Sequence, residues 1–530
     1  MLNKTLIESE THIDKAAFFL FLIIAIYLMV VHLSPTIGSN EAVYVLQVMK
    51  WANPGLYTND WSLNLSNSFG VYFSAFSYPF FSLIEDKILA VQLLRVILWG
   101  FLIFSIVNLT SAMKIDLRAS LFGILIFLGI QNNIGLMAGE WLFGGAEQKV
   151  ISYGLSFLAL SAMLKQKYAL SGLFSGLAFF THVIVGGWSA IGLSIIVLAQ
   201  GRKEFFRYAY SAVPLALVTF LIVFSGMKHE DIILFADLDV AESLVTFRNP
   251  HHLNASVFTT TDAAIIMFGC LVLISYNCWF VNSNKEIKYI SYYLLIMGTF
   301  VAAGFVAHKF KYFDLLALYP YRVAAVTWPL ISAIYFSNLL LHSWRKRQVI
   351  LSKKLLLSFF LSVIVILIPL TYAFYGWISD TPKLLEGTKG NAQKIDDNKT
   401  YAWIKNHTPI DSVVLANPCR GDFWFSAERA MVVNFKLTPV NINYHEWYRR
   451  MFTLNRSKDF AGNGFGACAD LDQNFNALSE EQLKNIQLLY RTDYYLSDIE
   501  RLDLYRCLVF RGEVNFIYDL AVCDIRAKIE

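Results

Sequence analysis

Charged residues are scarce in this chain. Only 16% of its 530 residues are Asp, Glu, Lys or Arg, against about 25% in an average soluble domain, and 56% are hydrophobic. This balance excludes a single ordinary soluble domain. It also excludes intrinsic disorder, which needs few apolar residues and many charges. The formal net charge of only +4 gives no basic surface large enough to predict a nucleic-acid partner.

The few charges are distributed unevenly. They make up about 12% of residues 1–376 but about 26% of residues 377–530, and the second value is ordinary for a soluble domain. We therefore predict two domains, a transmembrane domain over 1–376 and a soluble α/β domain over 377–530. In the second domain short apolar runs such as Val413–Leu415 alternate with helical patterns, one of which begins at a Ser479–Gln482 capping box.

Long apolar runs dominate the first domain. A membrane helix needs roughly 20 apolar residues, because each adds about 1.5 Å across a hydrocarbon core of about 30 Å. This criterion predicts eleven spans, over residues 16–33, 87–111, 119–137, 148–164, 168–182, 184–199, 208–226, 261–281, 289–307, 323–341 and 355–376. The runs 168–182 and 184–199 are short for two crossings, but together they are too long for one.

The distribution of Lys and Arg predicts the orientation, because cytoplasmic loops carry the excess of positive charge. With the N-terminus inside, the inner segments hold about 16 positive charges and the outer loops about half a dozen. Eleven crossings then place the C-terminal domain outside. Four of the six cysteines, Cys419, Cys468, Cys507 and Cys523, lie in that domain. In an oxidising compartment they predict two disulfides with three possible pairings, and otherwise four buried thiols.

Polar residues at the predicted outer membrane edge carry the functional signal, because ionisable groups there are costly and usually have partners. The segment Gly38-Ser39-Asn40-Glu41 precedes an amphipathic pattern typical of an interfacial helix. Glu41 is therefore either a helix-capping carboxylate or a functional one. The loop 139–149 adds Glu140, Glu147 and Lys149, which fit a metal ion, a phosphate or simple mutual neutralisation.

Three further clusters fall on the same side. His182, at the apex of the two short helices, is either a hydrogen-bonded structural group or part of a site. Arg248 with His251 and His252 fits a phosphate clamp, since guanidinium forks match phosphate oxygens, but the imidazoles also fit a metal ion, and surface charge is the alternative. Arg322 either holds a lipid phosphate or extends toward lipid headgroups.

One basic residue lies deeper. Arg95 falls two turns inside the predicted span 87–111, where an unpaired charge is costly, so we expect it to pair within the bundle. The sequence does not name its partner. Taken together, the outer clusters suit a lipid-linked phosphate donor: a carboxylate base activates an acceptor hydroxyl, and cations stabilise the phosphate leaving group.

With these residues the chain resembles the GT-C superfamily of polytopic membrane glycosyltransferases, in which an acidic residue of the first outer loop is followed by an interfacial helix. In many members this residue belongs to an Asp-Glu pair, whereas here the pair reads Asn40-Glu41. The segments 248–252, 427–429 and 446–450 are similar to those of uncharacterised bacterial membrane proteins near that superfamily. The resemblance implies a GT-C-like fold of about eleven transmembrane helices with an extracytoplasmic C-terminal α/β domain, in the bacterial inner membrane.

The resemblance also implies an inverting glycosyltransferase. It would move a sugar from a polyprenyl-phosphate-linked donor to a glycan or lipid acceptor on the outer face, among membrane lipids. Glu41 would be the base or a metal ligand, and Glu140 or Glu147 the second acidic group. The residues expected to hold the donor are Lys149, His182, Arg248, His251, His252 and Arg322. A divalent metal ion is left open. The soluble domain lacks a Trp-Trp-Asp acceptor motif, so transfer to protein is not expected.

Two alternatives remain at this point. The first is a non-catalytic protein of the same fold, or a polysaccharide polymerase or assembly protein, that binds a lipid-linked glycan; the missing acidic residue at Asn40 motivates it. The second is a transporter, which would need a polar path continuing toward the cytoplasm.

Overall fold

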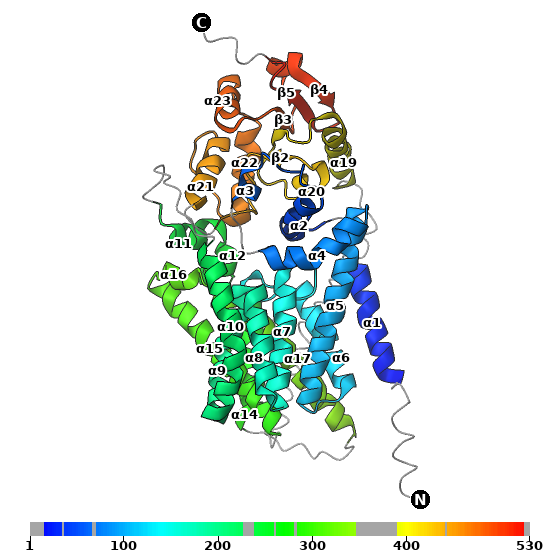
Figure 1. The fold of residues 1–530 in the computed structure, drawn as a ribbon, viewed down its shortest axis with the longest axis vertical. Helices are drawn as coiled ribbons and strands as arrows, with labels where there is room; N and C mark the ends of the chain where they lie inside the picture. The colour runs from blue at the N-terminus through cyan, green and yellow to red at the C-terminus, as the bar shows by residue number, and fades with distance from the viewer. Residues whose placement is uncertain are drawn as a thin grey trace, which may run out of the picture.

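The computed structural model describes residues 15–33, 37–65, 70–225, 238–258, 261–279, 284–345, 390–439 and 443–523. Within them, long helices run side by side as a bundle, and a smaller domain of helices and strands stands on one end of it (Figure 1). The predicted span 355–376 and the domain boundary at 376 lie outside the described residues and stay predictions.

Ten of the eleven predicted spans are helices in the structure. They are α1 Lys15–His32, α5 Lys87–Ala112, α6 Leu117–Asn133, α7 Gln148–Leu164, α8 Tyr168–Thr181, α9 Val183–Gln200, α10 Arg202–Ser225, α14 Thr261–Trp279, α15 Lys285–Lys309 and α17 Arg322–Arg345. Six helices among the described residues are long and apolar enough to cross a membrane, those of α1, α5, α9, α10, α15 and α17. The separate helices predicted for 168–182 and 184–199 are present, joined at His182. The chain is thus a multi-pass membrane protein by helix length and composition.

The bundle packs in the way expected of helices in lipid. Only 11% of the apolar window of α10 is buried within the protein, so most of its surface is left for lipid. Where helices do meet, small residues allow close approach. A Cβ at Gly123 in α6 would lie 2.7 Å from the Cα of Ile334 in α17, and one at Gly172 in α8 would overlap the carbonyl of Tyr208 in α10.

A layer of short segments separates the bundle from the upper domain (Figure 1). It consists of α2 Ser39–Ala52, α3 Trp61–Asn64, α4 Val71–Leu83, η2 Met137–Gly139, α11 Val240–Ser243, the π-helical turn η3 Leu244–Arg248, α12 Pro250–Leu253, α13 Ala255–Phe258 and α16 Phe313–Leu316. The predicted interfacial helix is α2. The sequence did not predict α4, because its 13 residues are too few for a span and Pro79 interrupts the helical pattern.

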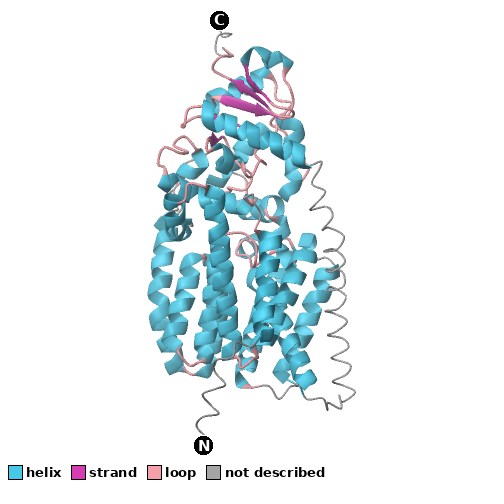
Figure 2. Ribbon diagram, turned by 90° about the vertical axis from the view of Figure 1, so that its right-hand side faces the viewer, coloured by secondary structure: helices cyan, strands magenta, loops and turns pink. Residues whose placement is uncertain are grey.

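The upper domain is the predicted α/β unit, with its sheet near the tip of the molecule (Figure 2). Its elements are α19 Gly390–His407, β1 Val413–Leu415, α20 Phe423–Ala427, β2 Ala430–Met431, α21 Asn443–Leu454, η4 Gly464–Gly466, α22 Ala467–Phe475, α23 Glu480–Tyr490, β3 Tyr494–Ser497, η5 Leu502–Cys507, β4 Leu508–Arg511 and β5 Phe516–Asp519. The strand order is β2-β1-β3-β5-β4, with β1 parallel to both neighbours and β5 antiparallel to both of its own. The two predicted disulfides are present, as Cys419–Cys468 and Cys507–Cys523.

Buried hydrogen bonds join the upper domain to the layer beneath it. Asp60 caps α3 through the amide of Leu63 at 2.9 Å, and its other oxygen accepts from Trp424 Nε1 at 2.7 Å and from the amide of Met431 at 3.0 Å. The hydroxyl of Tyr57 donates to the carbonyl of Trp424 at 2.8 Å. Because these groups are fully buried, losing these hydrogen bonds would leave each of them without a hydrogen-bond partner.

Candidate functional site

The predicted site residues gather at the end of the bundle that meets the upper domain. Glu41 lies in the first turn of α2, Glu140 follows η2, and His182 lies between α8 and α9. The others are Glu147 and Lys149 at the start of α7, Arg248 at the end of η3, His251 and His252 in α12, and Arg322 at the start of α17. Ion pairs join Glu140 to Lys149 and Arg322 and Lys149 to Glu147, and the rings of His251 and His252 contact each other.

Glu140 forms ion pairs with two cations of the site. Its side chain accepts from Lys149 Nζ at 2.5 Å and pairs with Arg322 Nε at 2.7 Å through the other oxygen. Burial alone would raise the pKa of this carboxyl, but the charges of Lys149 and Arg322 outweigh burial and lower the pKa to about 2. Glu140 is therefore ionised at any physiological pH, and it fixes the position of both cations.

Glu147, the second carboxylate of the site, differs from Glu140 in its contacts and in the direction of its pKa shift. Its side chain is buried, Oε2 lies 3.5 Å from Lys149 Nζ, and the side chain of Asn40 hydrogen-bonds to it. Oε1 is buried without a hydrogen-bond partner among the described residues. Burial raises the pKa of Glu147, Lys149 opposes this, and the charge of Glu140 reinforces it. A carboxyl whose pKa is raised by burial and whose second oxygen has no hydrogen-bond partner is a candidate for proton transfer.

Glu41 is enclosed rather than open. Arg95 donates to both of its oxygens, from Nε at 2.7 Å and from Nη2 at 2.5 Å, and is the partner that the sequence could not name. The amides of Ala146 and Gly38 donate to the same oxygens at 2.6 and 2.8 Å. A Cβ at Gly145 would lie 2.5 Å from the Glu41 side chain, which explains the glycine there. This geometry favours the helix-capping interpretation of Glu41.

Arg248 is buried among neutral partners. Its guanidinium donates to Thr438 Oγ1 at 2.6 Å, to Asn249 Oδ1 at 2.8 Å and to the carbonyl of Lys436 at 3.2 Å. It also stacks on the ring of Phe435 at 4.4 Å. Among the described residues no carboxylate pairs with Arg248, and burial lowers its pKa to about 10.

Lys436 is a second cation of this kind, and the sequence did not predict it. Its Nζ donates to Asn40 Oδ1 at 2.5 Å and lies 4.6 Å from the ring centre of Phe465. No carboxylate within the described ranges forms an ion pair with it. Burial, and then the charge of Arg248, lowers the pKa of Lys436 to about 8. A single lysine in an apolar run of the upper domain gave no local signal that it would reach α2.

The histidines are held as neutral rings. His252 Nδ1 lies 2.5 Å from the carbonyl of Ala138, so this nitrogen carries the proton and Nε2 is an acceptor. Burial, together with neighbouring cations, lowers the pKa of His251 to about 4 and that of His252 to about 3. His182 Nδ1 accepts from the amide of Val185 at 3.2 Å, so it caps α9, within electrostatic range of Arg322.

The described residues do not fit a metal ion. Among them no group of three or more His, Cys, Asp or Glu side chains is placed to hold one. Glu41 and Glu140 already bind guanidinium or ammonium groups through both oxygens. The rings of His251 and His252 pack against each other with centres 4.1 Å apart. The metal-ligand alternative for these residues therefore finds no support in their arrangement.

Positive charge exceeds negative charge at the site. Its cations are Lys149, Arg248, Arg322 and Lys436. They face two carboxylates, Glu140 and Glu147, of which the second is the easier to protonate. The Glu41–Arg95 pair adds no net charge. Because unmatched buried charge is costly, at least two excess positive charges favour an anionic ligand.

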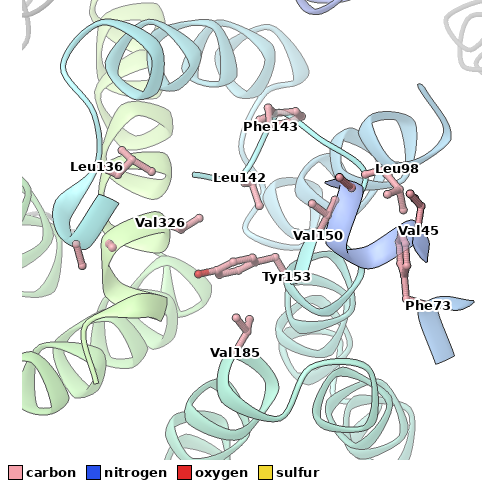
Figure 3. Packing of buried hydrophobic residues seen from close by; sticks show 14 of the residues in the cluster. Val45, Phe73, Leu98, Leu136, Leu142, Phe143, Val150, Tyr153, Val185 and Val326 are labelled. Carbon is pink, nitrogen blue, oxygen red and sulfur yellow. The ribbon is translucent and has the colours of Figure 1, made fainter. Parts of the chain in front are cut away.

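An apolar layer lies below these charges. Figure 3 shows Leu142, Val150, Tyr153, Val185 and Val326 converging from different segments. Each is almost fully buried; Val150 follows Lys149 in the first turn of α7, and Val326 lies one turn beyond Arg322 in α17. The Tyr153 hydroxyl donates to the carbonyl of Arg322 at 2.9 Å.

Comparisons with known proteins add little beyond this geometry. Residues 396–454, from α19 to α21, match a family described as a domain of unknown function (DUF6798). No curated protein matches the chain. Among solved structures, the chain is similar to the archaeal oligosaccharyltransferase AglB from Archaeoglobus fulgidus, in complex with an inhibitory peptide and a dolichol-phosphate. The identity is 14%, the TM-score is 0.40, and the match covers 87% of this chain and 65% of that chain. This chain thus spans less than two thirds of the archaeal protein's length.

Proposed function

We propose that this protein is a GT-C-type membrane glycosyltransferase that moves a sugar from a polyprenyl-phosphate-linked donor to a glycan or lipid acceptor. The observation that carries the proposal is the excess of positive charge at the buried Arg248 and the partly buried Lys436, close to a buried carboxylate, Glu147, one oxygen of which has no hydrogen-bond partner among the described residues. The site lies at the end of an apolar bundle, where the headgroup of a long-chain lipid phosphate would reach it. We place this end on the outer face of a bacterial inner membrane.

Two groups of residues take different parts. Arg248 and Lys436 bind the donor phosphate, because charge-assisted hydrogen bonds to phosphate are strong and these cations have no carboxylate of their own among the described residues. Glu147 accepts the proton of the acceptor hydroxyl. Glu140 holds Lys149 and Arg322 in place, and Glu41 fixes the start of α2 against Arg95.

The transfer is a single displacement with inversion. The acceptor hydroxyl oxygen attacks the anomeric carbon of the donor sugar, and its proton passes to Glu147. The bond between the anomeric carbon and the phosphate oxygen breaks, and its electron pair leaves with the polyprenyl phosphate. The charge that develops on that phosphate is stabilised by Arg248 and Lys436.

A non-catalytic lipid-phosphate-binding protein is the second candidate. One specific observation favours it: both oxygens of Glu41 are taken by Arg95, and Asn40 stands where the resemblance implies a second acidic residue. Such a protein would use the cations for binding and would leave Glu147 without a role.

Mass spectrometry of co-purifying lipids separates these candidates. We expect a sugar-bearing polyprenyl phosphate to co-purify with the wild-type protein, to accumulate in Glu147→Gln, and to be lost in Arg248→Met. Removing a general base slows transfer by about 10²- to 10⁴-fold, so the donor should remain bound. The matched control is Glu286→Gln, a buried carboxyl near the opposite end of the bundle that pairs with Lys114.

The opposing outcomes are distinct. If neither the wild-type protein nor Glu147→Gln retains a polyprenyl-phosphate lipid, the proposed function is wrong. If both retain equal amounts, and the purified protein releases no free polyprenyl phosphate with any acceptor extract, the non-catalytic candidate replaces the enzyme. If Glu286→Gln alters the bound lipid as strongly as Glu147→Gln, the effect is not specific to this site.

A further inference from the structure

An exposed aromatic side chain lies beside the cations of the proposed phosphate site. The side chain of Phe465 is 51% exposed. Its ring centre nevertheless lies 4.6 Å from Lys436 Nζ, 5.4 Å from the ring of His251 and 5.9 Å from that of Phe435. One face of the ring therefore borders the proposed phosphate site while a large part of it remains uncovered.

The segment that carries Phe465 is firmly held. Gly464 has φ +54°, and a Cβ there would lie 3.2 Å from Pro250, so this position suits glycine in both conformation and space. Asp470 accepts from the amides of residues 461 and 462 at 2.9 Å each. The Cys419–Cys468 disulfide anchors the segment three residues beyond the ring. Phe465 is thus displayed on a rigid support, at low entropic cost for a ligand that covers it.

Polar groups that a sugar could use border the same ring. His251 is neutral and partly exposed, and its nitrogens form no hydrogen bond within the described residues, so it offers one donor and one acceptor. Lys436 has only one hydrogen-bond acceptor, Asn40, among the described residues. An exposed aromatic face, a free imidazole and an ammonium group together match a pyranose ring, which has an apolar face and a rim of hydroxyls.

We propose that Phe465 is a stacking platform for a sugar ring of the substrate, with His251 bonding to a ring hydroxyl while the substrate phosphate lies on Arg248 and Lys436. This inference rests on the proposed function and makes it more specific. The ligand is a glycosyl phosphate recognised through its sugar as well as its phosphate. Phe465 would set the preference for a sugar-bearing lipid over the bare lipid phosphate.

Two lipid probes test the platform on the full-length protein in detergent. One is undecaprenyl phosphate, and the other is undecaprenyl phosphate carrying glucose, galactose, mannose or N-acetylglucosamine, with the tightest binder used. We expect Phe465→Ala to weaken the sugar-bearing probe about tenfold and to change the bare phosphate less than about twofold. Phe465→Trp, which keeps an aromatic face, should restore most of the difference. Tyr505→Ala, which removes an exposed ring on η5, is the matched control and should change neither probe.

Each remaining outcome counts against one specific statement. If Phe465→Ala weakens both probes equally, the ring shapes the phosphate site or contacts the lipid chain, and the platform is wrong. If Phe465→Ala leaves both affinities unchanged, the platform is equally wrong, while the proposed function stands as long as the wild-type protein binds the lipids. If the wild-type protein binds neither probe, the proposed function itself fails.

Discussion

Adjacent residues of α2 contact two cations in different surroundings, the buried Arg95 and the partly buried Lys436. Glu41 meets Arg95 with two charged hydrogen bonds, and two backbone amides complete the shell around its carboxylate. Asn40 meets Lys436 with a neutral amide oxygen, and Arg248 nearby is likewise surrounded by neutral groups. The Glu41–Arg95 pair is electrically neutral without a ligand. Lys436 and Arg248 keep their positive charges, which a negatively charged ligand would neutralise. Charge balance, rather than burial alone, thus separates a structural pair from a binding site.

The largest effect should come from breaking the complete pair. Arg95→Met leaves Glu41 buried without its cation, and we expect the free energy of unfolding in detergent to fall by about 3–5 kcal/mol. Adding Glu41→Gln to Arg95→Met removes the unmatched charge and should restore at least half of this loss. If Arg95→Met costs less than about 1 kcal/mol, the pair is not structural and the comparison fails.

The opposite pattern is expected for Arg248. Arg248→Met leaves no carboxylate without a partner in the described part of the chain, but it removes the donor to three buried or partly buried oxygens, so the free energy of unfolding should fall by about 1–2 kcal/mol, less than for Arg95→Met. The affinity for undecaprenyl phosphate should fall about 100-fold, because a charged hydrogen-bond partner of the ligand is lost. Chemical unfolding and lipid titration on the same preparation measure both quantities. A loss of stability comparable to that of Arg95→Met would contradict the distinction.

A single substitution at Asn40 should give Lys436 a carboxylate partner, as Glu41 is for Arg95. Asn40→Asp places a carboxylate 2.5 Å from Lys436 Nζ, where the amide oxygen now lies. The new ion pair would neutralise Lys436, and we expect affinity for undecaprenyl phosphate to fall about tenfold. Asn40→Ser removes the same amide without adding charge and serves as the control. Equal losses in the two variants would show that the hydrogen bond, and not the charge, matters.

The smallest effect is a dependence of binding on pH. Burial lowers the pKa of Lys436 to about 8, so Lys436 is charged below pH 8 and loses its charge above it. Phosphate binding favours the charged form, so affinity should be full below pH 8 and should fall severalfold between pH 8 and 9.5. A glycosyl phosphodiester keeps one charge over this range, which isolates the lysine. In Lys436→Met the slope should disappear; if it persists, another group titrates.

Structural features that depend on neighbouring residues could be predicted from the sequence, whereas contacts between residues far apart in the chain could not. The spans were predictable because the bilayer requires about 20 apolar residues whatever the fold, whereas α4, with 13 residues and Pro79, met no such requirement. The capping box at Ser479 is also local, and it is present in the structure. The candidate site residues of the bundle could be proposed because ionisable groups at a membrane edge stand out from their apolar neighbours.

Partners that meet only in space were not predictable. Arg95 lies 54 residues from Glu41, and Lys436 lies 396 residues from Asn40. The residues that flank each member of these two pairs give no indication of its partner. The same limit explains why Glu41 and Glu147 could not be distinguished, since both are glutamates at the start of a helix. Only the surrounding donors distinguish them, because they pair both oxygens of Glu41 and leave one buried oxygen of Glu147 without a hydrogen-bond partner.

The hydrogen bond between Tyr57 and Trp424 has a consequence for the order in which the parts of the protein fold. The two residues are 367 positions apart, so Tyr57 is synthesised long before its partner exists. At about 5–20 residues per second, the interval is about 20–70 s. During that time Asp60 Oδ2 and the Tyr57 hydroxyl lack their partners in the upper domain, and Lys436 has not yet reached α2. The site can therefore form only after Lys436 and its surrounding segment have been made, so chains truncated before that point would carry the membrane helices without a complete site.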